Sequence, residues 1–247
     1  MENRTDKNSY TIVFAIIMVI VVGALLAFLA SSLKPRIAEN ERLEKQQNIL
    51  YAMGVNDNDE TSANFVSTKE APKLFEKYIK KQLVIQDGEV TENDEAYLID
   101  VKKEQANAKA GIPRRLPLFI GEKDGKTYYI APIRGKGLWD AIWAYIAMDK
   151  NMVVKGAFFD HAAETPGLGA NIKQRYFMDD FIGEHLMSNG TFKGIDVAKG
   201  NADPRNEDKT DHAVDAIAGA TITGDGVSAM IRNDLKLYVP YFENLKQ

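Results

Sequence analysis

A threonine near the C-terminal end of the chain presents a hydroxyl at a position suited to phosphate. Thr221 follows Gly219 and Ala220 directly, in the run DAIAGAT, and helical spacing resumes just after it. Backbone N–H groups at the start of a helix have no partner within the helix, and the helix dipole favours an anion there. The sequence therefore indicates a phosphate site at Thr221. The plainer alternative is that this threonine only caps the helix that follows.

Two further glycine-containing segments are candidates for ligand contact. In residues 134–139, two glycines allow the backbone to approach a flat ligand, and the indole of Trp139 can stack on an aromatic ring. Residues 164–169 read ETPGLG, and the Pro-Gly pair predicts a tight turn. That turn would display Glu164, Thr165 and Leu168. Taken alone, each segment has a plainer explanation, a core tryptophan in one case and a surface turn in the other.

Composition excludes several classes of function. The net charge of −4 and the lack of a long basic run argue against nucleic acid as the main partner. The chain has no cysteine, which excludes a disulfide, a cysteinyl nucleophile and a cysteine-ligated iron–sulfur cluster. The three histidines form no spaced ligand pair, so no metal site is expected. Neither a dinucleotide-binding fingerprint nor a carboxylate dyad is present.

The N-terminal region predicts one membrane span. Residues 12–29 are almost wholly apolar, and about 20 residues at about 1.5 Å each cover a hydrocarbon core of roughly 30 Å. We assign residues 1–10 to an N-terminal tail and 11–33 to a transmembrane helix; the alternative is a cleaved signal peptide. Basic residues are more numerous after the span, which taken literally puts the large domain in the cytoplasm. Long domains cross membranes largely regardless of charge, so the residues do not decide on which side of the membrane the large domain lies.

The rest of the chain predicts a helical extension and linker over 34–70 and an α+β domain over 71–247. The extension is expected to end at Gly54. Asp124-Gly125 predicts the turn of a hairpin over 117–133. Further strands are expected at 83–86, 96–101, 141–147 and 153–159, the last two paired. Helices are expected at 71–82, 172–187 and 226–238.

Three ordered motifs and the anchor resemble a known family. Gly137-Leu138-Trp139, residues 164–169 and the run that ends in Gly219-Ala220-Thr221 occur in the order typical of the FMN-binding domain of respiratory flavoproteins. Arg114-Arg115 ahead of the hairpin, and His212 just before Asp215, also match. The resemblance covers essentially the full chain. The layout resembles the C subunit of the sodium-translocating NADH:quinone reductases.

This resemblance implies a covalent flavin. In the family, FMN is joined through its phosphate to a threonine hydroxyl, here Thr221; the alternative acceptor is Thr223, a second nearby hydroxyl. A flavin transferase takes the FMN from FAD and recognises an Asp-x-x-Ser/Thr-Gly-Ala-Thr pattern. Asp215, Gly219 and Ala220 match that pattern, whereas Ala218 stands in place of the usual Ser or Thr. The flavin ring is expected to lie against the other two motifs. The expected ring contacts are Leu138, Trp139, Glu164, Thr165, Gly167 and Leu168.

The resemblance also implies a role. The chain would be an electron-relay subunit, without a complete active site of its own, in a bacterial inner-membrane complex. That complex oxidises NADH, reduces quinone and pumps Na⁺ out of the cytoplasm. The large domain would be periplasmic, and the tail over residues 1–10 would be cytoplasmic. One alternative is the flavinylated subunit of the related ferredoxin:NAD electron-transport complex, against which the long stretch between Gly54 and Arg114 argues. The others are an anchored flavin-binding sensor or assembly protein, and an anchored domain without cofactor.

Overall fold

The computed structural model describes all residues except 1–7, 60–61, 201–202, 204 and 246–247. It contains two compact units, residues 1–42 and 43–247. Most of the cytoplasmic tail predicted at 1–10 lies outside the described residues. Both units share the first helix, and the second also contains all the strands, which confirms the α+β fold class.

The helix α1 (Asn8–Ala52) is the one helix in the described part of the chain that is long and apolar enough to cross a membrane. Its side chains from Tyr10 to Leu33 are exposed, as expected of a surface that meets lipid rather than protein. The helix stops just before Gly54, whose φ of +76° confirms the predicted end. Its last residues, from Leu43 onward, belong to the second unit, where Gln46 and residues 48–52 are buried.

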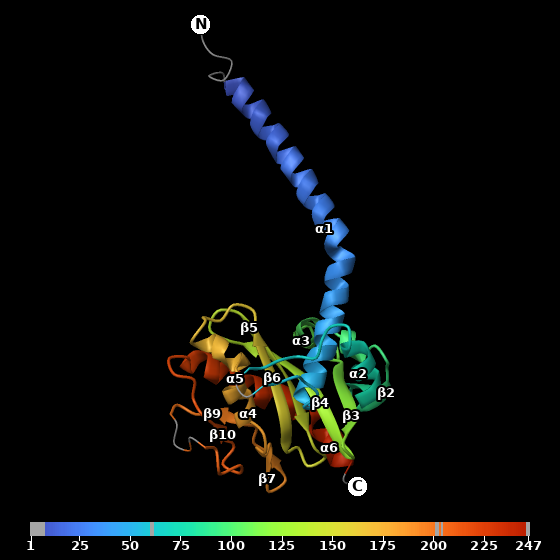
Figure 1. Cartoon of the computed structure of the whole chain (residues 1–247), viewed down its shortest axis with the longest axis vertical. Coiled ribbons are helices and arrows are strands. Elements are labelled where there is room, and N and C mark those ends of the chain that lie inside the picture. Colours follow the sequence, from blue (N-terminus) through green and yellow to red (C-terminus); the bar gives the residue numbers. More distant parts are fainter. Residues whose placement is uncertain (1–7, 60–61, 201–202, 204, 246–247) are drawn as a thin grey trace. The chain divides into compact units, whose positions relative to one another are not determined.

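A six-stranded antiparallel sheet forms the centre of the second unit (Figure 1). Its strands lie in the order β2-β1-β3-β4-β5-β6. Their bounds are Ile79–Gln86 (β1), Glu89–Glu92 (β2), Leu116–Lys123 (β3), Lys126–Lys136 (β4), Ala141–Met148 (β5) and Val154–His161 (β6). The short pairs β7 (Met187–Ser188) with β8 (Thr191–Phe192), and β9 (Asp196–Val197) with β10 (Ala213–Val214), lie outside this sheet.

Local turn chemistry accounts for the hairpins. Asp124 and Gly125 have φ values of +52° and +71°, which confirms the predicted turn between β3 and β4. The predicted pairing of β5 with β6 is also confirmed, and the Asp149 carboxylate accepts hydrogen bonds from two amides of their connection. Asp87-Gly88 makes an equivalent turn into β2, a strand that our sequence analysis did not predict.

The helices differ more from expectation. They are α2 (Ala71–Tyr78), α3 (Val101–Lys109), α4 (Arg175–Asp180), α5 (Thr221–Asp234) and α6 (Val239–Asn244), with 3₁₀ turns η2 (Ala96–Leu98), η3 (Gly169–Lys173) and η4 (Leu235–Tyr238). The strand predicted at 96–101 is wrong, because this segment is a 3₁₀ turn followed by Asp100, whose side chain caps α3. The helix predicted at 71–82 ends at Tyr78, where β1 begins. The one predicted at 172–187 is confined to η3 and α4.

The two faces of β6 are covered by different segments. Phe158 packs against Tyr51 at the end of α1, with 5.6 Å between ring centroids. Its neighbour Phe159 packs against Phe177 of α4 and Phe181, at 5.5 and 4.9 Å. Successive strand residues point to opposite faces, so the end of α1 and α4 lie on opposite sides of the sheet. Apolar side chains therefore form one core layer on each face of the sheet.

The helix α5 lies directly on β4, and begins at Thr221 rather than at the predicted residue 226. A side chain at Gly226 would clash with the carbonyl oxygen of Lys136, and one at Gly135 would meet Met230. At the other end of the helix, the buried Asp234 carboxylate accepts two hydrogen bonds from Arg114, at 2.9 and 3.0 Å. It also accepts one from the amide of Arg134. These contacts fix where the first turn of α5 lies.

A second buried acid, Glu184, lies near Lys209 of the segment that leads to α5. Glu184 is fully buried, and no described residue donates a hydrogen bond to either carboxylate oxygen at normal distance. Burial raises the pKa of Glu184 to about 7; Asn206 and Lys209 oppose the rise, whereas Asp211 and Asp180 add to it. The nearest cation, the ammonium of Lys209, is 3.8 Å away. Glu184 is therefore largely protonated below neutral pH.

Replacing Asp234 by alanine should strongly destabilise the protein. The change leaves the largely buried Arg114 guanidinium without its partner, at an expected cost of about 3–5 kcal/mol. Urea unfolding of the full chain in detergent would measure it. The neighbouring Asn233→Ala, at an exposed position on the same helix, serves as the control and should cost under about 1 kcal/mol. Equal unfolding midpoints for the two variants would contradict this account of α5.

Stability should fall as pH rises from about 5 to about 8, and Glu184 should be one cause. The folded state keeps the Glu184 proton up to about pH 7, whereas the unfolded chain releases it near the ordinary carboxyl pKa. The stability that this difference contributes is complete at low pH, and it is lost as the pH rises through the pKa of Glu184 in the folded state. Relative to wild type, Glu184→Gln should gain about 2–3 kcal/mol over this range. The exposed Glu122→Gln is the control; parallel pH profiles for E184Q and wild type would refute the assignment.

Candidate functional site

A cavity of about 250 Å³ lies at the N-terminal end of α5 and brings the three sequence motifs together. One wall comes from the loop after β4, one from the turn after β6, and one from the start of α5. Of the predicted site residues, seven line it: Leu138, Glu164, Thr165, Leu168, Gly219, Ala220 and Thr221. Three segments that are separated in sequence, between Leu138 and Thr223, thus meet at one place.

The start of α5 is open to an anion. Thr221 is the first residue of the helix, and Ala220 before it has no side-chain oxygen to cap the first turn. Among the described residues, no acceptor binds the amides of Thr221, Ile222 and Thr223; the first bond of the helix runs from Gly224 to the Ala220 carbonyl. Three N–H groups and the positive end of a 14-residue helix therefore face the cavity region.

The two candidate hydroxyls have different surroundings. Thr221 is exposed and its hydroxyl has no hydrogen-bond partner among the described residues. Thr223 is only 1% exposed, and its hydroxyl donates a 2.6 Å hydrogen bond to the Glu164 carboxylate. Only the first of these hydroxyls is free to react with an external group.

Glu164 connects all three walls of the cavity. Its carboxylate is buried; one oxygen accepts the Thr223 hydroxyl and the other accepts the backbone amide of Trp139 at 3.0 Å. Its own amide donates to the ring Nδ1 of His161 at 3.2 Å. Both carboxylate oxygens thus already have partners in the protein, which makes this carboxylate a brace between walls rather than a free polar group.

Three glycines allow the walls of the cavity to approach one another closely. A side chain at Gly137 would overlap the Glu164 carboxylate, and one at Gly169 would overlap both Glu164 and the Thr223 hydroxyl. Gly219 has a φ of +71°, and a Cβ there would come within 2.8 Å of Leu168. Glycine at these positions is therefore a steric requirement of the site.

The rim of the cavity is apolar and unusually exposed. Leu138, Leu168 and Ile222 are 44%, 41% and 58% exposed, and Trp139 is 65% exposed. The indole N–H of Trp139 donates to the Thr165 hydroxyl at 3.1 Å, which holds the ring beside the cavity. The predicted Pro166-Gly167 turn is confirmed, with Gly167 at φ +78° and a bond from the Leu168 amide to the Thr165 carbonyl. Flat apolar surface of this kind suits an aromatic ligand.

Besides Trp139 at the rim, two predicted site residues lie outside the cavity lining. Gly167 is at the tip of its turn and borders a separate hollow beside Phe158. Asp215 lies on the segment ahead of α5, where its amide donates to the Asp180 carboxylate at 2.9 Å. Burial and the charges of Asp180 and Asp203 raise the pKa of Asp215. The structure joins neither of them to the cavity, so any role for them acts from outside it.

Sequence reasoning did not assign structural roles to Ile222, Gly169 or Thr223. The spacing of Thr221 and Thr223 could have predicted that only one of them is accessible. Residues i and i+2 at the start of a helix point in different directions, one outward and one inward. The described residues contain no cluster of His, Asp or Glu able to hold a metal ion. The chemistry of the site therefore depends on a hydroxyl, three amides and an apolar rim.

Comparison with known proteins places the chain among flavoproteins of one family. Residues 137–236 match the FMN-binding domain family. The chain is 30% identical to the C subunit of the Na(+)-translocating NADH-quinone reductase of Pseudomonas aeruginosa, over 94% of this chain and 92% of the relative. It is also 30% identical to the same protein of Yersinia pestis, over 91% and 87%.

Solved structures are similar as well. The crystal structure of the C subunit from Parabacteroides distasonis has a TM-score of 0.72 and 34% identity, over 85% of this chain and 96% of that one. That of Shewanella oneidensis NqrC has a TM-score of 0.67 and 26% identity, over 84% and 98%. The chain therefore belongs to the family of C subunits of the Na(+)-translocating NADH-quinone reductase.

Proposed function

We propose that this chain carries FMN, bound through its phosphate to the hydroxyl of Thr221, and relays electrons within a multi-subunit membrane complex. The complex oxidises NADH, reduces quinone and moves Na⁺ out of the cytoplasm. The observation that carries the proposal is the free Thr221 hydroxyl next to three unpaired amides at the start of α5. The membership of the chain in the family of reductase C subunits supports it.

The residues present fit the phosphate end of FMN. A phosphodiester at Thr221 is anionic, and the three amides and the helix dipole stabilise negative charge at this place. Since Gly219 and Ala220 carry little or no side chain, the approach to the hydroxyl is open. A flavin transferase that delivers FMN from FAD would meet an exposed acceptor.

The small cavity favours a covalent bond over simple binding. Small-molecule sites usually enclose about 300–1,000 Å³, and this cavity of about 250 Å³ is smaller. An enclosed pocket holds its ligand by burial, whereas a ligand on an exposed surface needs another means of retention. A bond to Thr221 supplies it. Retention also matters if the domain is periplasmic, as we propose, because lost FMN is not easily replaced there.

The apolar rim would hold the flavin ring. Leu138, Trp139 and Leu168 supply the exposed apolar surface, and Thr165 supplies a hydroxyl beside it. Glu164 acts indirectly, since its oxygens bind Thr223 and Trp139. When bound, FMN supplies the ability to accept electrons and pass them on. We assign the FMN-binding domain to residues 71–247, and the NADH and quinone sites to partner subunits.

Thr221→Ala should abolish flavin attachment, whereas Thr221→Ser should retain it. The acceptor hydroxyl is lost in the first variant and kept in the second. Thr223→Val serves as a second control, because its buried hydroxyl faces Glu164 and should not be modified. Chains produced with the flavin transferase would be denatured and examined by in-gel fluorescence and peptide mass. Flavin on T221A, or flavin mapped to Thr223, would overturn the proposed linkage.

Glu164→Ala should destabilise the protein and reduce flavin loading together. It leaves the buried Thr223 hydroxyl and the Trp139 amide without their acceptor, at about 2–4 kcal/mol. Glu164→Gln keeps one acceptor oxygen and should cost less. Thr165→Val, which removes only the exposed bond to the indole, should cost under about 1 kcal/mol. Thermal unfolding of the full chain and its flavin content give both readouts; wild-type values for E164A would exclude the bracing role.

A further inference from the structure

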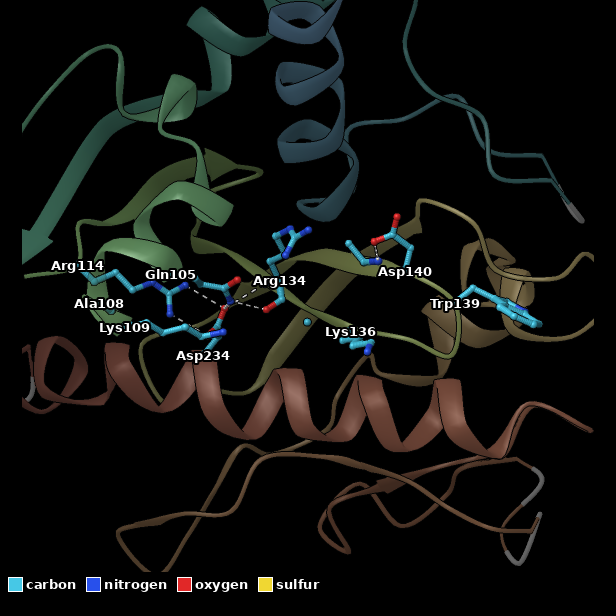
Figure 2. Close-up of a pocket in the computed structure, with 11 residues that line it drawn as sticks. Gln105, Ala108, Lys109, Arg114, Arg134, Lys136, Trp139, Asp140 and Asp234 are labelled. Carbon is cyan, nitrogen blue, oxygen red and sulfur yellow. Dashed lines mark hydrogen bonds and ion pairs between the residues drawn. The ribbon is translucent and has the colours of Figure 1, made fainter. Parts of the chain in front are cut away.

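A second hollow, of about 750 Å³, adjoins the flavin site, and apart from Trp139 its lining has no part in the proposed function. It forms a groove with Trp139 at one end and Arg114 at the other (Figure 2). Trp139 is also bound to Thr165 of the flavin cavity, so the two sites share this residue as a boundary. We refer to the hollow as the basic groove, because four basic and two acidic side chains line it. They are Lys109, Arg114, Arg134, Lys136, Asp140 and Asp234.

The basic groove follows an open edge of β4. The ladder between β3 and β4 ends at the pair Phe119–Ile130, but β4 continues to Lys136. Gln105 of α3 and Asp234 of α5 bind the carbonyl and amide of Arg134 in place of a partner strand. The groove therefore lies between α3 and α5, against a strand that they only partly cover.

Three cations in the basic groove have no counter-ion. Arg114 is neutralised by Asp234. The side chains of Lys109, Arg134 and Lys136, in contrast, form no ion pair or hydrogen bond with any described residue. The whole chain carries a net charge of −4, so this groove has the opposite sign to the molecule around it. A local field of this kind attracts an anionic occupant.

The spacing of the cations favours a polypeptide over a small anion. The three side chains come from two different elements and point in different directions (Figure 2). Arg134 and Lys136 are two residues apart on β4, which is about 6–7 Å along the strand. One phosphate group does not span such a set, whereas a segment with several carboxylates does. The exposed indole of Trp139 at the groove's end is the kind of side chain that protein interfaces bury.

We propose that the basic groove docks an acidic segment of the polypeptide that exchanges electrons with the flavin on Thr221. The inference rests on the proposed function, since it names the electron partner of that same site. A partner seated there contacts Trp139 and lies next to the cavity that contains Thr221. Charge attraction brings it to the flavin side of the molecule and sets its orientation.

Charge reversal tests this docking in the intact complex. The groove variant is Lys109→Glu with Lys136→Glu. The matched control is Lys126→Glu with Lys150→Glu, two exposed lysines of a separate hollow at the other end of β4 and β5. We expect NADH-dependent quinone reduction in membranes to fall about tenfold in the groove variant and to stay within about twofold in the control. Equal rates in the two variants would overturn the proposal.

Two further readouts separate this proposal from the proposed function. A carbodiimide that joins lysine amines to touching carboxylates should link Lys109 or Lys136 of wild type to an Asp or Glu of another subunit, as read by peptide mass. The absence of such links refutes the docking whether or not flavin is present. In-gel flavin fluorescence absent from all chains refutes the flavin instead. Fluorescence lost in the groove variant alone would assign the groove to the attaching enzyme, and so overturn the assignment to the electron partner.

Discussion

The buried carboxylate of Glu164 is the interaction on which the rest of the site depends. A buried charge is costly unless hydrogen bonds satisfy it, and here the donors are the Trp139 amide and the Thr223 hydroxyl. Since these donors belong to different walls, satisfying the charge requires the walls to meet. Gly137 and Gly169 remove the side chains that would prevent it. The hydrogen bond to Glu164 also fixes Thr223. Thr221, two residues earlier, is left facing outward, and the amides of Thr221, Ile222 and Thr223 have no acceptor among the described residues. A structural requirement of the core thereby selects which hydroxyl is available.

The helix α5 connects this arrangement to the central sheet, because it packs on β4. Its first turn is uncapped and begins with the exposed Thr221 and Ile222, whereas its last residue, Asp234, is buried in an ion pair with Arg114. Gly135 and Gly226 let the helix lie closely on β4, so the position of Thr221 depends on contacts along the whole helix. The same contacts leave the end of β4 without a partner strand, and the basic groove lies along that edge. One packing geometry therefore produces both the proposed attachment site and the surface that we assign to the electron partner.

Much of this was open to prediction from sequence, and the failures have physical reasons. Asp124-Gly125 predicted its hairpin correctly, because positive φ is a local requirement; Asp87-Gly88 carries the same signal and was not used. Asp100 is a helix cap, and reading its neighbours as a strand ignored that side chain. The three motifs of the site were found because their residue types have chemical meaning. The two hydrogen bonds that Glu164 accepts, and the cations without counter-ions, were not predicted, because both depend on elements that only the fold brings together.

A structure of the full chain loaded with FMN tests the central claim most directly. The account predicts phosphate oxygens on the Thr221 hydroxyl oxygen, within hydrogen-bond distance of the amides of Ile222 and Thr223. It also predicts that the Glu164 carboxylate still joins Thr223 to Trp139, as it does in the present structure. A phosphate bound to another residue, or a Glu164 side chain turned away from Thr223 with the flavin still in place, would contradict it.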